Sequence, residues 1–467
     1  MKQRKWRLSA IAAVMMLIAV ACGGSSASTG PKETVEITWY CCLGTGDNVD
    51  TQVPVEQKVV DDWNAAHPEI HVTLEVVPNK TAKDTLLTEN AAGNPPDVVG
   101  PAGVAGSNGF YGQWLDLTPL IKDANYDLGQ FPEAAVKAFA VGGQGQLGLP
   151  FAVFPSYMYF RPSLFTEAGL NPPPTAYDQQ YKMPDGTMVD WSWDTIKAIG
   201  KILTVDAAGK DATQTGFNPN KVVQYGYSQP WNGAPEWGNW FKNGQLLQSD
   251  GKTVAVPAGW TEAWTWMHDG IFKDHFIPSS DLLALKEWGE GNSFPTGKIA
   301  MGMSYTWYTC CLGETIGTDW NIAPAPSWNG SAATPDLNAD TFRISAGSKH
   351  PAEAFQFMTY LLGDASSTLL AIYGGMPARD ADQAAFFPNL NTTKGFTQNP
   401  YWDIAKESYK RAGAASAEAY VPNYLKYRDY IYNDFSPKLQ KDATMDVSAY
   451  VTGTLIPAIQ AIADEAP

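Results

Sequence analysis

The chain has 467 residues, with 48 Asp and Glu against 32 Lys and Arg, which gives a formal net charge of −16. Nucleic-acid binding depends on clustered positive charge, so this acidity excludes a phosphate-backbone ligand. The length is sufficient for two or three domains or lobes. After the N-terminal segment no apolar run approaches the length that a membrane-spanning helix needs.

The N-terminus has the pattern of a secretory signal. Basic residues 2–7 precede an apolar run over 8–20, which is too short to span a bilayer, so a signal peptide is predicted over 1–21. Small residues then lead to Cys22, in a pattern that resembles a bacterial lipobox. Residues 22–33 are predicted to form a lipid anchor and flexible tether. An ordinary secretory signal with an incidental cysteine is the alternative.

Strands and helices alternate over the next hundred residues. Period-2 apolar patterns predict strands over 35–42, 70–78 and 95–100, and helical patterns predict helices over 53–68 and 82–93. This alternation indicates a mostly parallel sheet in an α/β fold. Ligands of such sheets bind beyond the carboxyl ends of the strands, where the pair Cys41 and Cys42 is expected.

The middle of the chain is rich in Gly, Pro and Trp and is less regular. Helices are predicted over 191–204, with Ser192 or Asp194 as the N-cap, and over 259–272, and a buried strand over 297–305. From about Pro351 the chain is expected to be mainly helical, with clear periodicity over 351–363 and 447–466.

Several segments occur in one order along the chain: "GNPPDVV", "GQWLDLTPLI", "LGLPFAVFPSYMYFRPSLFTEAGL", "SWDTIKAIGKILT", "GKIAMGMSYTW" and "SKHPAEAFQFMTYLL" with "GGMPAR". Together they resemble the extracellular solute-binding proteins of carbohydrate ABC transporters, the maltose-binding-protein-like family 1, over about 34–460. The resemblance implies an α/β, two-lobed periplasmic-binding-protein fold of type II, with a hinge and a ligand cleft between the lobes. It implies a binding protein rather than an enzyme, and no metal or cofactor is expected.

The resemblance also implies a domain map and partners. One lobe is expected over 34–153 plus 343–388, and the other over 154–342 plus 389–467. The ligand would be a small carbohydrate, and the closed, monomeric receptor would dock on the permease subunits of an ABC transporter. Its contact with the membrane would be the lipid on Cys22, at the extracellular face of a bacterial cell.

Sugar-binding sites need flat aromatic rings and convergent polar groups, because a sugar presents C–H faces and hydroxyls together. The Trp-rich stretch 229–244 offers such groups, and Trp307 lies where the resembling family places a stacking aromatic. The residues expected to contact the ligand are Cys41, Cys42, Phe154, Trp231, Asn232, Trp237, Trp240, Trp307, Asp340, Gly375, Met376, Tyr424 and Tyr427. The loop over 100–109 holds neither charge nor aromatic, so specificity for maltose cannot be transferred.

Two other classes of function use similar residues. A secreted glycoside hydrolase needs two carboxylates flanking the scissile bond, for which Glu287 with Glu290, or Glu236 with Asp250, are the pairs available. The same fold could instead bind a peptide or a polyamine, and a polyamine site would need several carboxylates among the aromatics. His67 and His71 mimic metal-ligand spacing, but Pro68 breaks the helix that would align them.

Four of the five cysteines lie in the pairs Cys41–Cys42 and Cys310–Cys311, and an exported chain favours disulfides. Four cysteines allow three pairings, and their spacing alone does not choose among them. On the implied lobe map, disulfides between the lobes would oppose hinge opening. Two vicinal disulfides, each presenting a rigid apolar face at the cleft, are therefore the hypothesis.

Overall fold

The computed structural model describes residues 34–43, 48–110, 112–141, 144–312, 316–413 and 419–465. The predicted signal peptide, tether and Cys22 lie outside these residues. Within the described part of the chain, no helix combines the length and the apolar character needed to cross a membrane.

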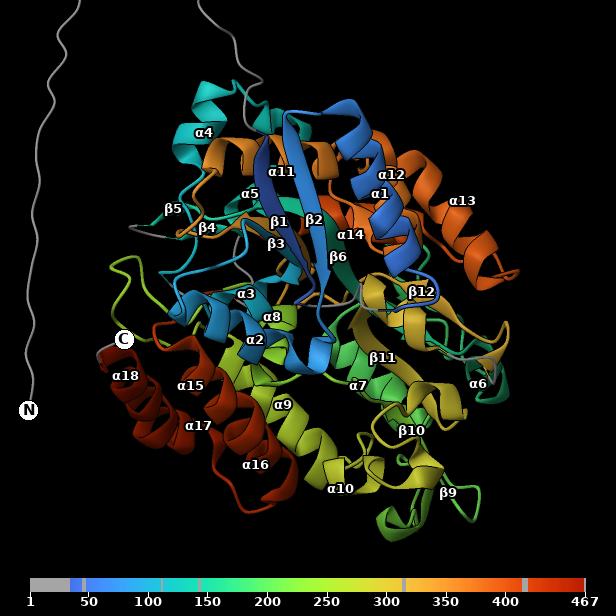
Figure 1. The fold of residues 1–467 in the computed structure, drawn as a ribbon. Helices are drawn as coiled ribbons and strands as arrows, with labels where there is room; N and C mark the ends of the chain where they lie inside the picture. The colour runs from blue at the N-terminus through green and yellow to red at the C-terminus, as the bar shows by residue number, and fades with distance from the viewer. Residues whose placement is uncertain are drawn as a thin grey trace, which may run out of the picture.

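The predicted α/β class is confirmed, because one large mixed sheet runs through the molecule with helices on both sides (Figure 1). Its main strand order is β2-β1-β3-β13-β6-β11-β10-β9, and β12 and β14 also pair with β6. On the predicted lobe map, the first lobe contains β1 (Val35–Cys41), α1 (Val53–Ala66), β2 (Ile70–Val76), α2 (Asn79–Ala91), β3 (Val98–Gly103), α3 (Val104–Asn108), α4 (Thr118–Asp123), α5 (Glu133–Lys137), β4 (Ala140–Val141), β5 (Gly145–Gln146), α11 (Pro351–Leu362), α12 (Ser366–Tyr373) and β14 (Met376–Pro377). Helix α13 (Gln383–Lys394) spans the predicted end of this lobe. Strand β1 pairs in parallel with both β2 and β3, as the alternating pattern predicts.

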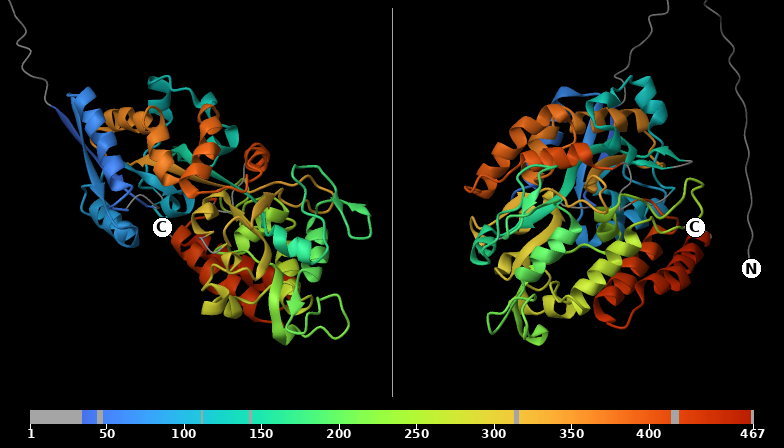
Figure 2. Two further views of the ribbon diagram at one scale, coloured as in Figure 1. Left: turned by 90° about the vertical axis from the view of Figure 1, so that its right-hand side faces the viewer. Right: turned by 180° about the vertical axis from the view of Figure 1, so that it is seen from behind.

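The second lobe of this map is centred on β11 (Ile299–Tyr305), which pairs with β10 (Val222–Tyr227) on one side and β6 (Leu149–Phe160) on the other. It contains α6 (Pro162–Glu167), β7 (Tyr181–Lys182), β8 (Met188–Val189), α7 (Trp193–Ile202), β9 (Val205–Asp206), β10 (Val222–Tyr227), α8 (Ala234–Phe241), α9 (Trp260–Phe272), α10 (Ser280–Leu283), β11 (Ile299–Tyr305), β12 (Asn321–Ala323), α14 (Asp403–Arg411), α15 (Tyr424–Asp429), α16 (Ser436–Lys441), α17 (Val447–Tyr450) and α18 (Ile456–Asp464). Figure 2 shows this lobe, in green, yellow and red, beside the blue, cyan and orange first lobe.

Local signals explain where α7 and α8 begin, and of these two helices only α7 was predicted. Ser192 caps α7, and its side chain accepts a hydrogen bond from the backbone N–H of Thr195. Helix α8 begins after Gly233, whose N–H donates to the Glu236 carboxylate at 2.9 Å. A carboxylate in the first turn also complements the helix dipole. The predicted helices over 191–204 and 259–272 are therefore confirmed as α7 and α9.

Two long strands connect the lobes. Strand β6 (Leu149–Phe160) pairs with β13 (Leu337–Ile344) through Pro155, and from Ser156 onward it pairs with β11. All twelve residues of β6 are buried, as expected for a strand covered on both faces. The change of partner at Pro155 and Ser156 lies close to the predicted crossing at 153/154. The predicted crossing at 388/389 falls inside α13, and the division into two rigid lobes stays a prediction.

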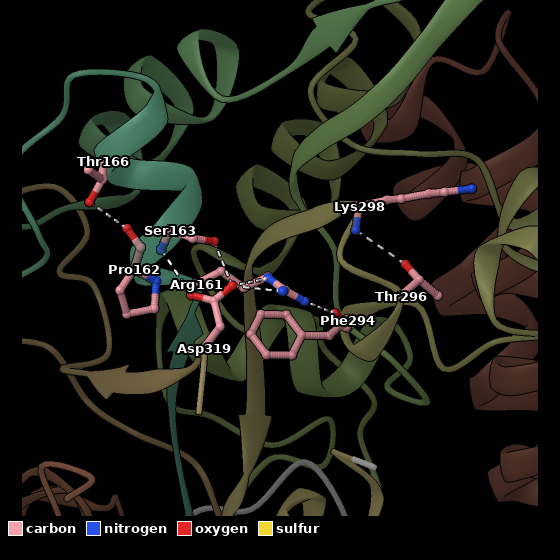
Figure 3. Close-up of polar contacts among 8 residues, drawn as sticks. All are labelled: Arg161, Pro162, Ser163, Thr166, Phe294, Thr296, Lys298 and Asp319. Atoms are coloured by element: carbon pink, nitrogen blue, oxygen red, sulfur yellow. Dashed lines mark hydrogen bonds and ion pairs between the residues drawn. The ribbon is translucent and has the colours of Figure 1, made fainter. Parts of the chain in front are cut away.

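The end of β6 is held in the second lobe by one carboxylate (Figure 3). Asp319 accepts hydrogen bonds from Arg161 Nε at 3.0 Å and Nη2 at 2.7 Å. It also accepts from Ser163, through the backbone N–H at 2.9 Å and the hydroxyl at 2.5 Å. Asp319 therefore fixes the start of α6 and the exit of β6 together.

Candidate functional site

The candidate site lies on one face of β13 and β6, where the two lobes meet. Asn338 is paired directly with Phe154, and Asp340 with Ala152. Directly paired residues point to the same face of a sheet, and residues two apart along a strand also share a face. Asn338, Asp340 and Phe154 therefore lie on one side. The opposite side carries Val153 and Ala339, which are buried in the core.

Three aromatic rings beside Asn338 form what we call the aromatic wall: Trp231, Trp307 and Tyr305. The rings of Trp231 and Trp307 are 6.4 Å apart with an interplanar angle of 23°, and those of Trp307 and Tyr305 are 5.7 Å apart at 20°. Trp231 is 54% exposed, Trp307 is half-buried and Tyr305 is buried. The wall thus begins in the core and ends at an open, flat indole.

Hydrogen bonds hold the inner part of the wall in place. Trp307 Nε1 donates to Asn338 Oδ1 at 2.9 Å. The Tyr305 hydroxyl donates to Asp336 Oδ2 at 2.7 Å, and Asn239 Nδ2 donates to Asp336 Oδ1 at 3.2 Å. Because these groups are fixed by buried polar partners, the Trp307 ring is preorganised rather than ordered by a ligand.

Asp340 is the carboxylate of the site. It accepts a hydrogen bond from the Tyr373 hydroxyl at the end of α12. Burial raises its pKa to about 6, and the hydrogen bond from Tyr373 opposes this rise. Gly375 keeps the neighbouring backbone close, because a Cβ there would meet Ala152 Cβ at 2.6 Å and Phe154 Cζ at 3.1 Å.

Asp340→Asn is expected to reduce the dependence of the melting temperature of the unliganded protein on pH. A carboxyl whose pKa is raised on folding stabilises the native state when protonated, and this contribution is lost as pH rises from about 4 through about 6. We expect the variant to melt roughly 2–4 °C above the original protein at pH 7.5, and the difference to vanish near pH 4. Thermal unfolding of both proteins across this range measures the effect. A difference that is constant with pH would contradict it.

The structure brings only part of the predicted set to this face. Trp231, Trp307, Phe154, Asp340 and Gly375 lie at it, and Asn232 lies beside Trp231 with its amide donating to the Pro230 carbonyl at 2.7 Å. Seven other predicted contacts have side chains at most 4% exposed: Cys41, Cys42, Trp237, Trp240, Met376, Tyr424 and Tyr427.

Five of these seven residues are buried for identifiable reasons. Met376 pairs with Val153 and therefore faces the core side of β6, away from Phe154. Trp237 and Trp240 lie on α8, all of whose residues are buried. Tyr424 and Tyr427 belong to α15 and pack on each other with ring centroids 5.8 Å apart. These side chains do not lie on the face described above, so we leave them out of the proposed site, and their contact with a ligand stays a prediction.

The two cysteine pairs differ in exposure. The structure joins Cys41 to Cys42 and Cys310 to Cys311. Cys41 and Cys42 are fully buried, within 4.8 Å of a carboxylate oxygen of the buried Glu56. Cys310 is exposed and Cys311 half-buried, directly after the aromatic wall. The first pair therefore lies under the surface at the end of β1, and its predicted contact with a ligand stays a prediction.

Sequence reasoning missed two residues of the site, Tyr305 and Tyr373, and also Asn292, which contacts the aromatic wall through Tyr308. Tyr305 could have been found, because it lies two residues before Trp307 in the predicted strand segment. Asn292, which accepts from the Tyr308 hydroxyl at 2.5 Å, lies in an irregular loop. Tyr373 reaches Asp340 from 33 residues away, and no local pattern indicates that contact.

Comparison with known proteins agrees with this architecture. A family model described as bacterial extracellular solute-binding protein matches residues 48–368. An uncharacterized lipoprotein in the oleD 5′ region of Streptomyces antibioticus is 24% identical over 396 residues, which cover 83% of this chain and 79% of that protein.

Solved structures are similar in fold at low identity. Lmo0181, an ABC substrate-binding protein of Listeria monocytogenes in complex with cycloalternan, has a TM-score of 0.63 at 19% identity, covering 92% of this chain and 98% of that chain. UspC of M. tuberculosis has a TM-score of 0.66 at 20% identity, covering 92% and 99%. The sugar-binding protein MalE of Xanthomonas citri has a TM-score of 0.65 at 17% identity, covering 92% and 97%.

Proposed function

Because the chain belongs to the bacterial extracellular solute-binding proteins, we propose that it binds a sugar or oligosaccharide between its lobes and delivers it to an ABC importer. The observation that carries this proposal is the aromatic wall beside Asn338 and Asp340. An indole face packs on the C–H surface of a sugar ring, while the amide and carboxylate bind hydroxyls. These two kinds of group converge at the place where β6 and β13 pass between the lobes.

The carbohydrate class has support from structural neighbours. The Listeria monocytogenes protein was solved with cycloalternan, and another neighbour, CpMnBP1, with mannotriose, at 19% and 20% identity respectively. Sequence identities this low support a common fold but do not identify the sugar, which depends on the residues of the site. The small residues over 100–109 make a maltose-like set of contacts from that loop unavailable.

The transport role rests on the domain map and the N-terminus. We propose that residues 34–153 with 343–388 and residues 154–342 with 389–467 close as two lobes about β6 and β13. The closed monomer would present both lobes to the permease subunits. A lipid on Cys22, with the signal peptide over 1–21 removed, would keep the receptor at the extracellular face of the cell membrane.

The hydrolase alternative has little support from its carboxylates. Burial raises the pKa of Glu236 to about 7, but its oxygens accept from Gly233 N–H and from the Tyr432 hydroxyl. Asp250 is exposed and closes a turn by accepting from the backbone N–H groups of Lys252 and Thr253. Glu236 is thus occupied in capping α8. A polyamine site is similarly disfavoured, since among the described residues Asp340 is the one carboxylate that we place at this face.

A thermal-shift screen of mono- and oligosaccharides, with peptides and polyamines alongside, tests the proposal on residues 34–467. A sugar present at 100 times its dissociation constant is expected to stabilise the protein by about 2.7 kcal/mol. Stabilisation by amines or peptides, and by no sugar, would overturn the carbohydrate class. Release of shorter sugars from an oligosaccharide during incubation would overturn the receptor role in favour of hydrolysis.

A further inference from the structure

We propose that Cys310–Cys311 is a thiol-reactive site. An external dithiol opens this disulfide while Cys41–Cys42 stays closed, and the opening loosens the aromatic wall. The part that concerns ligand affinity rests on the proposed function, whereas the thiol chemistry and the change in the wall do not.

The first argument is the contrast between two chemically identical dipeptides in one chain. Cys41 and Cys42 are each 0% exposed and lie in the hydrophobic core. Cys310 is exposed, and Cys311 is half-buried. Thiol–disulfide exchange requires a thiolate to reach a sulfur atom, so access separates the two pairs.

The surroundings of Cys310 favour such access. A cavity of about 390 Å³ is lined by Cys310 together with Trp320, Lys394 and Phe396. An aromatic and aliphatic lining accommodates the carbon skeleton of a small dithiol. Lys394 lines the same cavity, and its ammonium would attract the anionic thiolate, which is the attacking form. Cys41 and Cys42, by contrast, are fully buried, so in the described part of the chain no comparable opening leads a reagent to their sulfur atoms.

A short chain of contacts links this disulfide to the wall. The Cys311 carbonyl accepts from Asn292 Nδ2 at 2.7 Å, and Asn292 Oδ1 accepts from the Tyr308 hydroxyl at 2.5 Å. The Tyr308 ring packs edge-on against Trp231, with centroids 5.7 Å apart. Opening the ring frees the backbone of residues 310 and 311. The hydrogen bond from Asn292 to the Cys311 carbonyl is then weakened. Because Asn292 also holds the Tyr308 hydroxyl, the packing of Tyr308 against Trp231 is weakened as well.

The reaction balances with a dithiol as the reductant. One thiolate of the reagent attacks the Cys310 sulfur, the Sγ–Sγ bond breaks, and the Cys311 thiolate leaves and takes up a proton. The second thiol of the reagent then displaces Cys310 and forms the cyclic disulfide of the reagent. Two electrons and two protons pass from the dithiol to the protein, which carries two free thiols afterwards.

Graded dithiothreitol, followed by alkylation and peptide mass spectrometry, tests the chemistry on the native protein. Peptides from untreated protein are expected to contain both vicinal disulfides. Cys310 and Cys311 should then be alkylated at a dithiothreitol concentration at least tenfold below that needed for Cys41 and Cys42. In guanidinium chloride the two pairs should open together, since burial is the cause of the difference. Equal reactivity in the native protein, or a crosslink between residues 41–42 and 310–311, would overturn the proposal.

Hydrogen exchange tests the link to the wall without any ligand. Backbone amides over 305–312 should exchange faster in the selectively reduced protein and in the Cys310→Ser/Cys311→Ser double variant. Asn292→Ala should reproduce the change with the disulfide closed, and amides of β2 provide the control that stays constant. For any sugar identified by the screen, reduction should weaken affinity at least fivefold. Unchanged exchange at 305–312, or unchanged affinity, would overturn the proposed coupling between the disulfide and the aromatic wall. If the screen identifies no sugar, the exchange experiment still tests this coupling.

Discussion

Trp307→Ala is expected to weaken binding of the cognate sugar by about thirtyfold, which corresponds to about 2 kcal/mol. The indole is the central ring of the aromatic wall, stacked between Trp231 and Tyr305. Removing it deletes the preorganised surface for the sugar's C–H face and also releases Asn338, whose amide oxygen accepts from Trp307 Nε1 at 2.9 Å. Isothermal titration calorimetry with the sugar found in the screen measures the change.

Two further variants separate stacking from other effects. Trp307→Phe retains an aromatic face but loses the hydrogen bond to Asn338, so its loss of affinity should be intermediate. Trp328→Ala removes an indole outside the wall, one that packs on Phe241 and donates to Glu262, and should leave affinity within twofold. If Trp328→Ala weakened binding as much as Trp307→Ala, the aromatic wall would lose its assignment as the binding surface.

Asp319→Ala is expected to lower the free energy of unfolding by about 3 kcal/mol. The Arg161 side chain is 12% exposed, and Asp319 is the carboxylate paired with it. Removing the carboxylate leaves the guanidinium buried without a counter-ion and also leaves Ser163 N–H without its acceptor (Figure 3). Chemical denaturation followed by tryptophan fluorescence measures the loss.

The control for Asp319 is an ion pair of similar geometry at the surface. Lys58 and Asp62 meet at 2.7 Å, with side chains 69% and 55% exposed. Asp62→Ala should cost far less than Asp319→Ala, because an exposed pair is solvated in both states and screened by salt. Equal losses for Asp319→Ala and Asp62→Ala would contradict the argument that burial sets the strength of the Arg161–Asp319 contact.

Much of the first lobe could be predicted because its elements are set by local patterns. The predicted strand over 35–42 is β1 and the predicted strand over 70–78 is β2, and the helix between them is α1. The secondary structure in the middle of the chain was harder to predict, because its Trp-rich segments are broken by Gly and Pro and follow neither the helix nor the strand period. In this region the sequence predicted a cluster of exposed aromatic residues. Trp231 is exposed, whereas Trp237 and Trp240 are buried.

The candidate site shows the same division. Trp307 was predicted from a resembling segment, and the structure places it in the aromatic wall. Met376 lies in another segment that carries the family resemblance, but the register of β14 against β6 places its side chain in the core. A shift of one residue in register exchanges the two faces of a strand, and local sequence does not encode that choice.

The amino-acid sequence by itself determined the compartment expected for this chain, the α/β class, and the positions of the capped and periodic elements. These features depend on neighbouring residues, whose spacing and turn chemistry are visible along the chain. Only the tertiary structure decided which side chains meet at the site, that Tyr373 reaches Asp340, and that one cysteine pair is buried while the other is exposed. Those outcomes depend on contacts between segments far apart in the chain, which form when the lobes pack and which no local pattern specifies.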